Sequence, residues 1–420
     1  MQTYVKRIMG RVDSLEDYLI SLAKDLISIP TVNPPGLNYE ECVRFLAGKL
    51  KEIGLNVEYV RVPNEKLPEL APQGSGLPRV NLIASHTFDE SGPTLHFNGH
   101  YDVVPATGSW STDPFEPVVK DGKLYGRGSS DMKGGIASMM VAIKALIDLD
   151  LNLNGELSIS AVCDEETGGF AGSGFIVNEK LVEADYCVVG EPSGVRNILN
   201  AHKGALWVEI TTFGKSAHAS TPWLGVNAFE KMVKIVNEID RELGPRVESK
   251  ISKFPTVLLG GNRASIMVGG VVNCGRAANM VPDRCTLTVD RRFIPEEKVE
   301  DVKDEFSSLL QKLQREDPEL RYQLKFGEIN ACSTPKDSHL CRTLSESVKK
   351  VTASKPSITM CPGTLDMRYF AGAGIQTVAY GPGLMELSHI ENEYVLIDDL
   401  IAAAKIYALT ALKLLSQKNA

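Results

Sequence analysis

Strand-like and helix-like patterns alternate along the first half of this chain of 420 residues. The helical spacing covers 14–27, 39–53 and 134–149, and the strand-like runs cover 56–62, 79–86, 93–104, 156–165 and 185–191. Strands that alternate with helices pair mainly in parallel, and a parallel sheet needs helices on both faces. The alternation therefore predicts an α/β fold with a mostly parallel sheet flanked by helices. The proline- and glycine-rich stretch 63–78 is expected to be an exposed loop.

The order of the elements changes after Gly204. Strands and helices then follow as β-α-β-β-α-β, which is the ferredoxin-like order. The ranges are 205–214, 226–243, 256–272, 284–293, 296–316 and 320–329. A helix, a strand and a closing helix then resume the first pattern over 339–353, 375–381 and 397–415. We therefore expect residues 1–204 and 329–420 to form one domain, and residues 205–328 to form an inserted α+β domain.

Charge and cysteine content exclude several functional classes. The formal net charge of -8 argues against a nucleic-acid-binding protein that works through a basic surface. We expect no membrane segment, because no run approaches the roughly 20 apolar residues that span a bilayer. Without a secretory pattern at the N-terminus, and with eight scattered cysteines and no CxxC pair, the chain is expected to be cytoplasmic with reduced thiols. Any metal site must therefore use histidine and carboxylate ligands.

Acids and histidines stand where the predicted strands of the first domain end. They are His100, Asp102, Glu165, Glu166 and Glu191 at strand ends, Asp131 before the helix 134–149, and His389 after the last strand. Ligands of open α/β sheets collect at the carboxyl ends of the strands. Singly, each residue has an ordinary explanation, such as a helix N-cap for Asp131. Together they predict a metal site built from imidazoles and carboxylates.

Longer motifs surround these residues. HYDVVP, GKLYGRGSSDMKGG, DEETGG and GEPS occur in this order before His389 and resemble the M20 family of metallopeptidases and deacylases. The resemblance extends from Ile20 to the final helix. It implies a zinc-exopeptidase-like catalytic domain with an inserted ferredoxin-like lid and dimerisation domain. We therefore expect a hydrolase that acts on linear amides.

The resemblance also implies two divalent metal ions and their ligands. His100 and Glu191 would bind one ion, and Glu166 and His389 the other. Asp131 would bridge the two. Zn²⁺ is expected first, with Co²⁺ or Mn²⁺ as alternatives, because ligand type alone does not fix the metal. Three protein ligands for each ion leave a position for water, as in open catalytic zinc sites.

Two further acids receive roles from the same resemblance. Asp102 matches the carboxylate that hydrogen-bonds His100 and fixes its tautomer. Glu165 matches the general base, which accepts a proton from the attacking water and passes it to the leaving amine. This mechanism needs no covalent acyl-enzyme.

The resemblance assigns substrate contacts to the inserted domain. His218, in SAHAST, matches a histidine that reaches a neighbouring subunit's active site and stabilises the oxyanion. The sequence alone favours a surface histidine in a loop. Asn279 and Arg292 match positions that contact the substrate, and the choice of Arg292 over Arg291 rests on the resemblance. A homodimer that forms through the inserted domain is therefore expected.

The segment PGTLDMRYF resembles the family sequence G-T-x-D-x-R-F and assigns Gly363, Thr364 and Arg368 to the substrate. Arg368 can pair bidentately with a carboxylate, which suits an acidic acyl group or an amino-acid carboxylate. The departures are Leu365 and Met367, where small residues are usual, and Tyr369 in place of phenylalanine. They leave the shape of the substrate pocket open.

We therefore expect hydrolysis of an N-acyl amino acid, with N-succinyl-diaminopimelate as the first candidate and N-acetylornithine as the second. A dipeptidase, a carboxypeptidase or an aminoacylase of the same family is the alternative. A more remote one is an inactive binding protein, but such a copy should have lost Glu165 or a metal ligand, and none is missing. A nucleotide-dependent enzyme predicts a glycine fingerprint that the sequence lacks.

Overall fold

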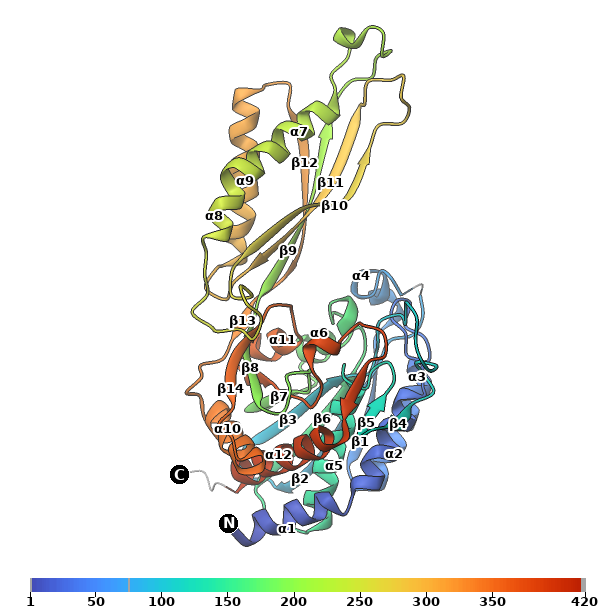
Figure 1. Cartoon of the computed structure of the whole chain (residues 1–420), viewed down its shortest axis with the longest axis vertical. Helices are drawn as coiled ribbons and strands as arrows, with labels where there is room; N and C mark the ends of the chain where they lie inside the picture. The colour runs from blue at the N-terminus through green and yellow to red at the C-terminus, as the bar shows by residue number, and fades with distance from the viewer. Residues whose placement is uncertain (1, 75, 417–420) are drawn as a thin grey trace. The chain divides into compact units, whose positions relative to one another are not determined.

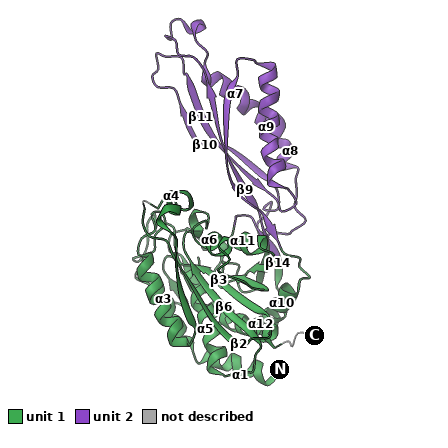
Figure 2. Ribbon diagram, turned by 180° about the vertical axis from the view of Figure 1, so that it is seen from behind, with its two compact units in different colours: residues 1–200, 334–358, 365–420 green, residues 201–333, 359–364 purple. Residues whose placement is uncertain are grey.

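The computed structural model describes residues 2–74 and 76–416 (Figure 1). The chain divides into two compact units, which Figure 2 shows in different colours. Unit 1 comprises residues 1–200, 334–358 and 365–420, and unit 2 comprises residues 201–333 and 359–364. The predicted domain boundaries at 204/205 and 328/329 stay a prediction, and residues 1 and 417–420 of the outer ranges lie outside the described residues.

A mixed sheet forms the centre of unit 1, with strands in the order β1-β2-β6-β3-β7-β15-β8-β13 and β14 paired with β8. The bounds are β1 Asn56–Arg61, β2 Val80–Asp89, β3 Thr94–His100, β6 Gly155–Val162, β7 Tyr186–Val189, β8 Asn197–His202, β13 Cys332–Ser333, β14 Ser357–Cys361 and β15 Gln376–Ala379. The neighbours β6, β3, β7 and β15 pair in parallel, whereas β1, β2 and β8 pair antiparallel. The predicted α/β class is therefore confirmed, with the parallel pairing at the centre of the sheet.

Helices cover both faces of this sheet (Figure 1). The bounds are α1 Gln2–Asp13, α2 Glu16–Ile27, α3 Tyr39–Ile53, α4 Leu67–Leu70, α5 Lys133–Asp148, α6 Ser173–Asn178, α10 His339–Thr352, α11 Met367–Gly372 and α12 Ile397–Leu415. Successive side chains of a strand point to opposite faces. On β3, Phe97 contacts Tyr407 of α12, whereas His96 contacts Phe370 of α11. Among the described residues, no helix is long and apolar enough to cross a membrane.

Helix α5 is buried along almost its whole length. It packs against β3, α2 and α12, which explains why apolar residues occur all round it. A Cβ on Gly135 would lie 2.5 Å from the carbonyl oxygen of Gly190, so only glycine permits this approach. The contact brings the start of α5 next to the end of β7.

A second, three-stranded sheet brings two distant segments together. It consists of β4 Val118–Lys120, β5 Lys123–Tyr125 and β16 Tyr394–Leu396, in the order β16-β5-β4. Tyr394 pairs with Tyr125 in the antiparallel register of β16 and β5. This pairing places the chain that follows His389 beside the chain that leads to Asp131.

One helix was not among those expected, and two local expectations were wrong. Helix α1 precedes the predicted first helix. Its residues Ile8 and Val12 are buried, although charged residues interrupt its apolar face. The stretch 63–78, expected as an exposed loop, contains α4 and the short helix η1 (Asn64–Lys66), with Leu67 buried. The strand expected over 256–272 begins later, because residues 256–264 form turns.

Unit 2 has the predicted β-α-β-β-α-β order. Its elements are β9 Gly204–Phe213, α7 Ala228–Glu238, α8 Gly244–Glu248, β10 Ser265–Cys274, β11 Arg284–Phe293, α9 Val299–Glu316 and β12 Arg321–Ile329. The antiparallel sheet has the order β10-β11-β9-β12, and α7 and α9 pack on β9. The core between helices and sheet includes Val208, Leu287 and Phe306. The ferredoxin-like prediction is therefore confirmed.

Candidate metal centre

The carboxyl ends of β3, β6 and β7 meet at the candidate site, because these strands are parallel neighbours. His100 is the last residue of β3, Glu165 and Glu166 begin the short helix η2 (Glu165–Thr167) after β6, and Glu191 follows β7. Two more groups come from outside the strands: Asp131 precedes α5, and His389 follows the short helix η5 (Met385–Leu387). The fold thus brings together the five residues that were predicted as ligands.

Asp131 lies between the two histidines. Its Oδ1 is 3.1 Å from Nε2 of His100, and its Oδ2 is 3.6 Å from Nε2 of His389. Each oxygen therefore faces a different imidazole, which is the arrangement that a bridging carboxylate requires.

Glu166 completes the group around His389. Its Oε2 lies 2.9 Å from Nε2 of His389. His389 has a backbone φ of 66°, in the left-handed region that histidine adopts only occasionally. Such conformations are frequent at functional sites, where the surrounding structure holds them.

Glu191 and Glu165 also lie close to His100. Two groups of three side chains each bring one ligand atom per residue within 4.8 Å of one another. The first group is His100, Glu165 and Glu191, and the second is His100, Asp131 and Glu166. Oε1 of Glu191 is 4.0 Å from Nε2 of His100. By distance alone, Glu165 is as close to this group as a ligand would be, although it was predicted as the general base.

Asp102 is fully buried beneath His100 and the turn η2. The nearest acceptor for Nδ1 of His100 is the backbone carbonyl of Asp102, at 3.0 Å, and the Asp102 carboxylate is 3.5 Å away. This carboxylate accepts the backbone N–H groups of Glu165 and Glu166, each at 3.2 Å, and the side-chain amide of Asn33 at 2.9 Å. Asp102 therefore holds the turn that carries both glutamates.

The donor set fits divalent metal ions. Burial raises the pKa values of Glu191 and Glu165 well above the ordinary range, and neighbouring carboxylates raise them further. Hydrogen bonding to Glu166 raises the pKa of His389 to about 9. Oε1 of Glu191 is buried and has no hydrogen-bond partner among the described residues. Buried carboxylates that repel one another, beside two imidazoles, are what bound cations stabilise.

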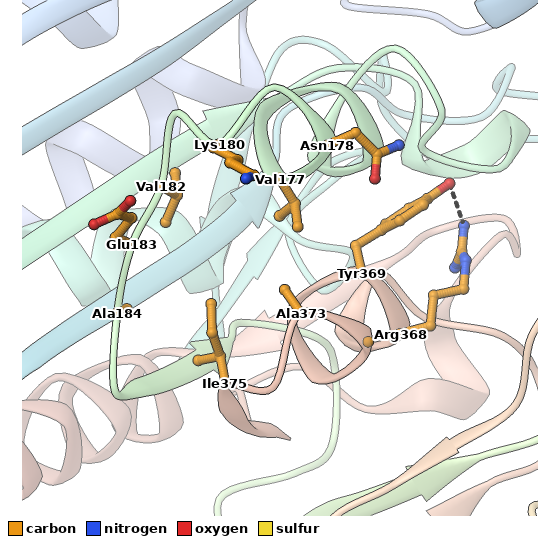
Figure 3. A pocket seen from close by; sticks show the side chains of 11 residues that line it. Val177, Asn178, Lys180, Val182, Glu183, Ala184, Arg368, Tyr369, Ala373 and Ile375 are labelled. Atoms are coloured by element: carbon orange, nitrogen blue, oxygen red, sulfur yellow. Dashed lines mark hydrogen bonds between the residues drawn. The ribbon is translucent and has the colours of Figure 1, made fainter.

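Arg368 is buried and bonded to backbone near the site. Its Nη1 donates to the carbonyl of Leu365 at 2.7 Å, and its Nη2 donates to the carbonyl of Gly168 at 2.5 Å. The Tyr369 hydroxyl donates to the same Gly168 oxygen at 2.7 Å and lies 3.1 Å from Nη2 of Arg368 (Figure 3). Both side chains also line a pocket of about 740 Å³ beside α6 and α11. In this structure Arg368 therefore anchors Gly168, the residue that follows η2.

The other predicted substrate contacts belong to unit 2, and they are described within that unit. Nδ1 of the exposed His218 lies 2.7 Å from the Ser220 hydroxyl. The backbone N–H of Ala219, the next residue, donates to the carbonyl of Asn279. Arg292 donates to Asp290 through Nε at 2.7 Å and Nη2 at 2.9 Å. Its neighbour Arg291 is fully buried and pairs with Glu297 and Glu305, as expected for the opposite strand face. Gly363 and Thr364 also fall in unit 2.

The sequence prediction missed several residues of this region. Asn33 has no motif that connects it with Asp102, although it stands in a segment rich in proline. Asp366, buried and 3.7 Å from Arg368, occurs within the motif PGTLDMRYF, so that motif could have identified it. Glu393 shares its loop with Glu391, and nothing in the sequence distinguishes the buried acid from the exposed one.

Known proteins resemble the chain over most of its length. The model of Peptidase family M20/M25/M40 matches residues 96–413. A succinyl-diaminopimelate desuccinylase of Buchnera aphidicola subsp. Acyrthosiphon pisum is 30% identical over 399 residues, which cover 93% of this chain and 96% of that protein. An N-formyl-4-amino-5-aminomethyl-2-methylpyrimidine deformylase of Bacillus subtilis is 30% identical over 434 residues, which cover 97% of this chain and 96% of that protein.

The fold agrees with these relatives. A solved M20 family metallo-carboxypeptidase from Sulfolobus solfataricus superimposes with a TM-score of 0.74 at 22% identity, covering 95% of this chain and 99% of that one. The predicted hydrolase class, which acts on amides, is confirmed by the family match and the desuccinylase relative. This chain belongs to Peptidase family M20/M25/M40.

Proposed function

We propose that this enzyme removes the acyl group from an N-acyl amino acid, with N-succinyl-diaminopimelate as the first candidate substrate and N-acetylornithine as the second. The single observation that carries the reaction class is the position of Asp131, whose two oxygens face His100 and His389 separately. The choice of substrate is supported by the desuccinylase relative, whose similarity extends over both units.

In this proposal, His100 and Glu191 would hold one divalent ion, Glu166 and His389 would hold the other, and Asp131 would bridge them. Zn²⁺ is the metal we expect, with Co²⁺ or Mn²⁺ as alternatives. When bound, the ions would lower the pKa of a water molecule and polarise the scissile carbonyl. The remaining chemistry is carried by side chains of the protein.

Glu165 is the proposed general base. Its carboxylate accepts a proton from water as the water oxygen bonds to the carbonyl carbon, and it donates that proton to the amide nitrogen as the C–N bond breaks. The products are a carboxylic acid and a free amine. Asp102 supports both glutamates of η2 through their backbone N–H groups, so the base and a ligand keep a fixed spacing.

We assign substrate recognition to Arg368, Gly363 and Thr364, and to His218, Asn279 and Arg292 of the inserted domain. The guanidinium of Arg368 suits a substrate carboxylate, provided that it exchanges a backbone contact for the substrate. Arg292 is held by Asp290, and its side chain is partly exposed.

A substrate screen tests this function. The purified protein is loaded separately with Zn²⁺, Co²⁺ or Mn²⁺, its metal content is measured, and kcat/KM is determined for N-succinyl-diaminopimelate, N-acetylornithine and dipeptides. We expect an N-acyl amino acid to exceed every dipeptide by at least about tenfold. Hydrolysis confined to dipeptides would replace the proposal by a peptidase function.

The deformylase relative favours one second candidate, because it is as similar to this chain as the desuccinylase. The N-formyl aminopyrimidine named for that relative therefore belongs in the screen. A preference for it would retain the deacylase chemistry and change the amine that is released.

We further propose a homodimer in which His218 completes the partner's active site. β10 is an edge strand of the sheet in unit 2 and exposes Met267, Val271 and Val272, which an interface would cover. Mixing inactive Glu165→Gln and His218→Ala proteins tests the arrangement. We expect subunit exchange to restore activity, since a mixed dimer holds one intact site. Monomers at assay concentration would exclude it.

A further inference from the structure

A buried carboxylate that the mechanism does not use lies behind the Asp131 loop. Glu393 is fully buried. Its Oε1 accepts the backbone N–H groups of Ser130 at 2.8 Å and Asp131 at 3.0 Å, and the N–H of Gly128 lies 3.1 Å from both carboxylate oxygens. Its Oε2 accepts Nη1 of Arg127 at 2.7 Å. One side chain thus accepts three backbone N–H groups of this loop.

The loop is shaped to surround an anion. Gly128 has a φ of 90°, and a Cβ there would lie 2.9 Å from Cγ1 of Val103, so both conformation and space favour glycine. This bend turns the N–H groups of Gly128, Ser130 and Asp131 toward a common point, which is how backbone concavities bind anions. Without an acceptor at that point, several buried N–H groups would lose their hydrogen bonds.

The same carboxylate ties two ligand-bearing segments together. Glu393 follows His389 by one short stretch of loop, and its backbone carbonyl accepts the N–H of Gly126 at 3.0 Å. At the other end of the segment, the Ser130 hydroxyl donates to the carbonyl of Leu384 at 3.2 Å and accepts the Leu384 N–H at 2.9 Å. The chain around His389 is therefore fastened to the chain before Asp131 on both sides.

We propose that Glu393 is a positioning residue of the metal centre, which sets the spacing between Asp131 and His389 so that both can bind the same ion. The inference rests on the proposed function, because it concerns that site. It does not involve contact between Glu393 and substrate or metal. A simpler role, in which Glu393 only neutralises the buried Arg127, makes different predictions.

Zinc binding by Glu393→Gln tests the proposal. Glutamine keeps the size of the side chain, but its NH₂ group would face backbone N–H groups that now donate to the Glu393 carboxylate. Titration of the metal-free protein against a competing chelator should show a loss of roughly 10- to 100-fold in affinity for one of two ions, the usual effect of removing a group that supports ligands. Co²⁺ absorption should change at the same time. Glu391→Gln, at an exposed acid of the same loop, is the matched control and should bind both ions as the wild type does.

A double variant separates the two roles. If Glu393 only neutralises Arg127, then Glu393→Gln combined with Arg127→Met should regain wild-type zinc affinity, and this would overturn the proposal. If Glu393 positions the loop, the double variant should stay weak, because the backbone donors still lack their acceptor.

Two further outcomes are distinguishable. Wild-type affinity for both ions in folded Glu393→Gln overturns this inference but leaves the proposed function intact. Failure of the wild type to bind two ions overturns both. Should Glu393→Gln not fold, Glu393→Asp keeps the charge with a shorter reach. A smaller loss of affinity for one ion is then expected, and an unchanged affinity contradicts the proposal.

Discussion

Oδ1 of Asp102 lies 3.2 Å from the backbone nitrogen of Glu165. Its other oxygen lies 3.2 Å from the backbone nitrogen of Glu166 and accepts the Asn33 amide. The carboxylate therefore supports the turn that carries the base and a ligand, while the backbone carbonyl of Asp102 lies 3.0 Å from Nδ1 of His100. Asp102 acts on three functional groups while remaining fully buried.

Asp102→Asn should consequently impair more than the orientation of His100. The amide retains one acceptor oxygen, but its NH₂ group faces a backbone N–H of the turn, so the turn must move. We expect metal affinity or kcat to fall roughly 10- to 100-fold, as for other groups that support metal ligands. Steady-state kinetics and zinc titration measure both. Asp89→Asn, at an exposed position, is the control, and equal behaviour of the two variants would contradict the role of Asp102.

Glu165→Gln separates the general base from the ligands. If Glu165 transfers protons, the amide variant should keep both metal ions and lose roughly 10²- to 10⁴-fold in kcat. Metal content measured on the assayed sample decides the matter, because His100, Glu165 and Glu191 lie close enough to share an ion. Loss of a metal ion would show that Glu165 is a ligand and that the roles of Glu165 and Glu166 need reassignment. Glu90→Gln is an exposed control.

Removal of the metal should abolish hydrolysis. Glu165 can accept a proton, but only bound ions would lower the pKa of a water molecule and polarise the scissile carbonyl. We expect a chelator-treated sample to lose activity and to regain it with Zn²⁺, Co²⁺ or Mn²⁺, in an order that identifies the preferred metal. Full turnover in protein shown to be metal-free would rule out the mechanism.

Arg368 has two candidate roles that kinetics can distinguish. As a substrate contact, its loss in Arg368→Lys should raise KM about 10- to 100-fold for substrates with a carboxylate and much less for their amides. If Arg368 instead anchors Gly168, Arg368→Lys should lower kcat for both kinds of substrate alike. Tyr369→Phe is the matched comparison, because it removes the other donor to Gly168 and should cost about 1 kcal/mol of stability.

The fold was largely predictable because its signals are local. The alternation of strands and helices identified the α/β sheet, and the changed order after Gly204 identified the ferredoxin-like unit. The misses have local causes too. The charges of α1 obscure the buried face formed by Ile8 and Val12, and the apolar stretch around Leu258 is exposed in turns rather than paired in a strand.

The position of the candidate site was predictable for a geometric reason. Parallel strands end at one edge, so groups that follow β3, β6 and β7 must meet there. The supporting contacts were not predictable, because they join loops that are far apart in the sequence. Neither Asn33 nor Glu393 carries a pattern that indicates its partner, and the contact of Arg368 with Gly168 depends on how α11 packs. The role of each ligand stays a prediction until metal binding is measured.

His96 makes the stability of the fold depend on pH. It is fully buried in β3, and its two ring nitrogens each lie 2.8 Å from a serine hydroxyl, those of Ser158 and Ser160. Burial lowers its pKa to about 3, so the folded protein keeps the ring neutral, whereas the unfolded chain binds a proton below its ordinary pKa of about 6.5. Protonation therefore favours the unfolded state, and stability falls as the pH drops from about 6.5 toward 3.

At pH 5 the neutral, buried His96 should lower the free energy of unfolding by about 2 kcal/mol relative to pH 7.5. His96→Gln can still hydrogen-bond both serines but cannot titrate, so denaturation of the metal-free protein should show a shallower loss of stability between these pH values. Parallel curves for the wild type and His96→Gln would mean that the ring is protonated in the folded protein, and His339→Gln provides the matched substitution outside the core.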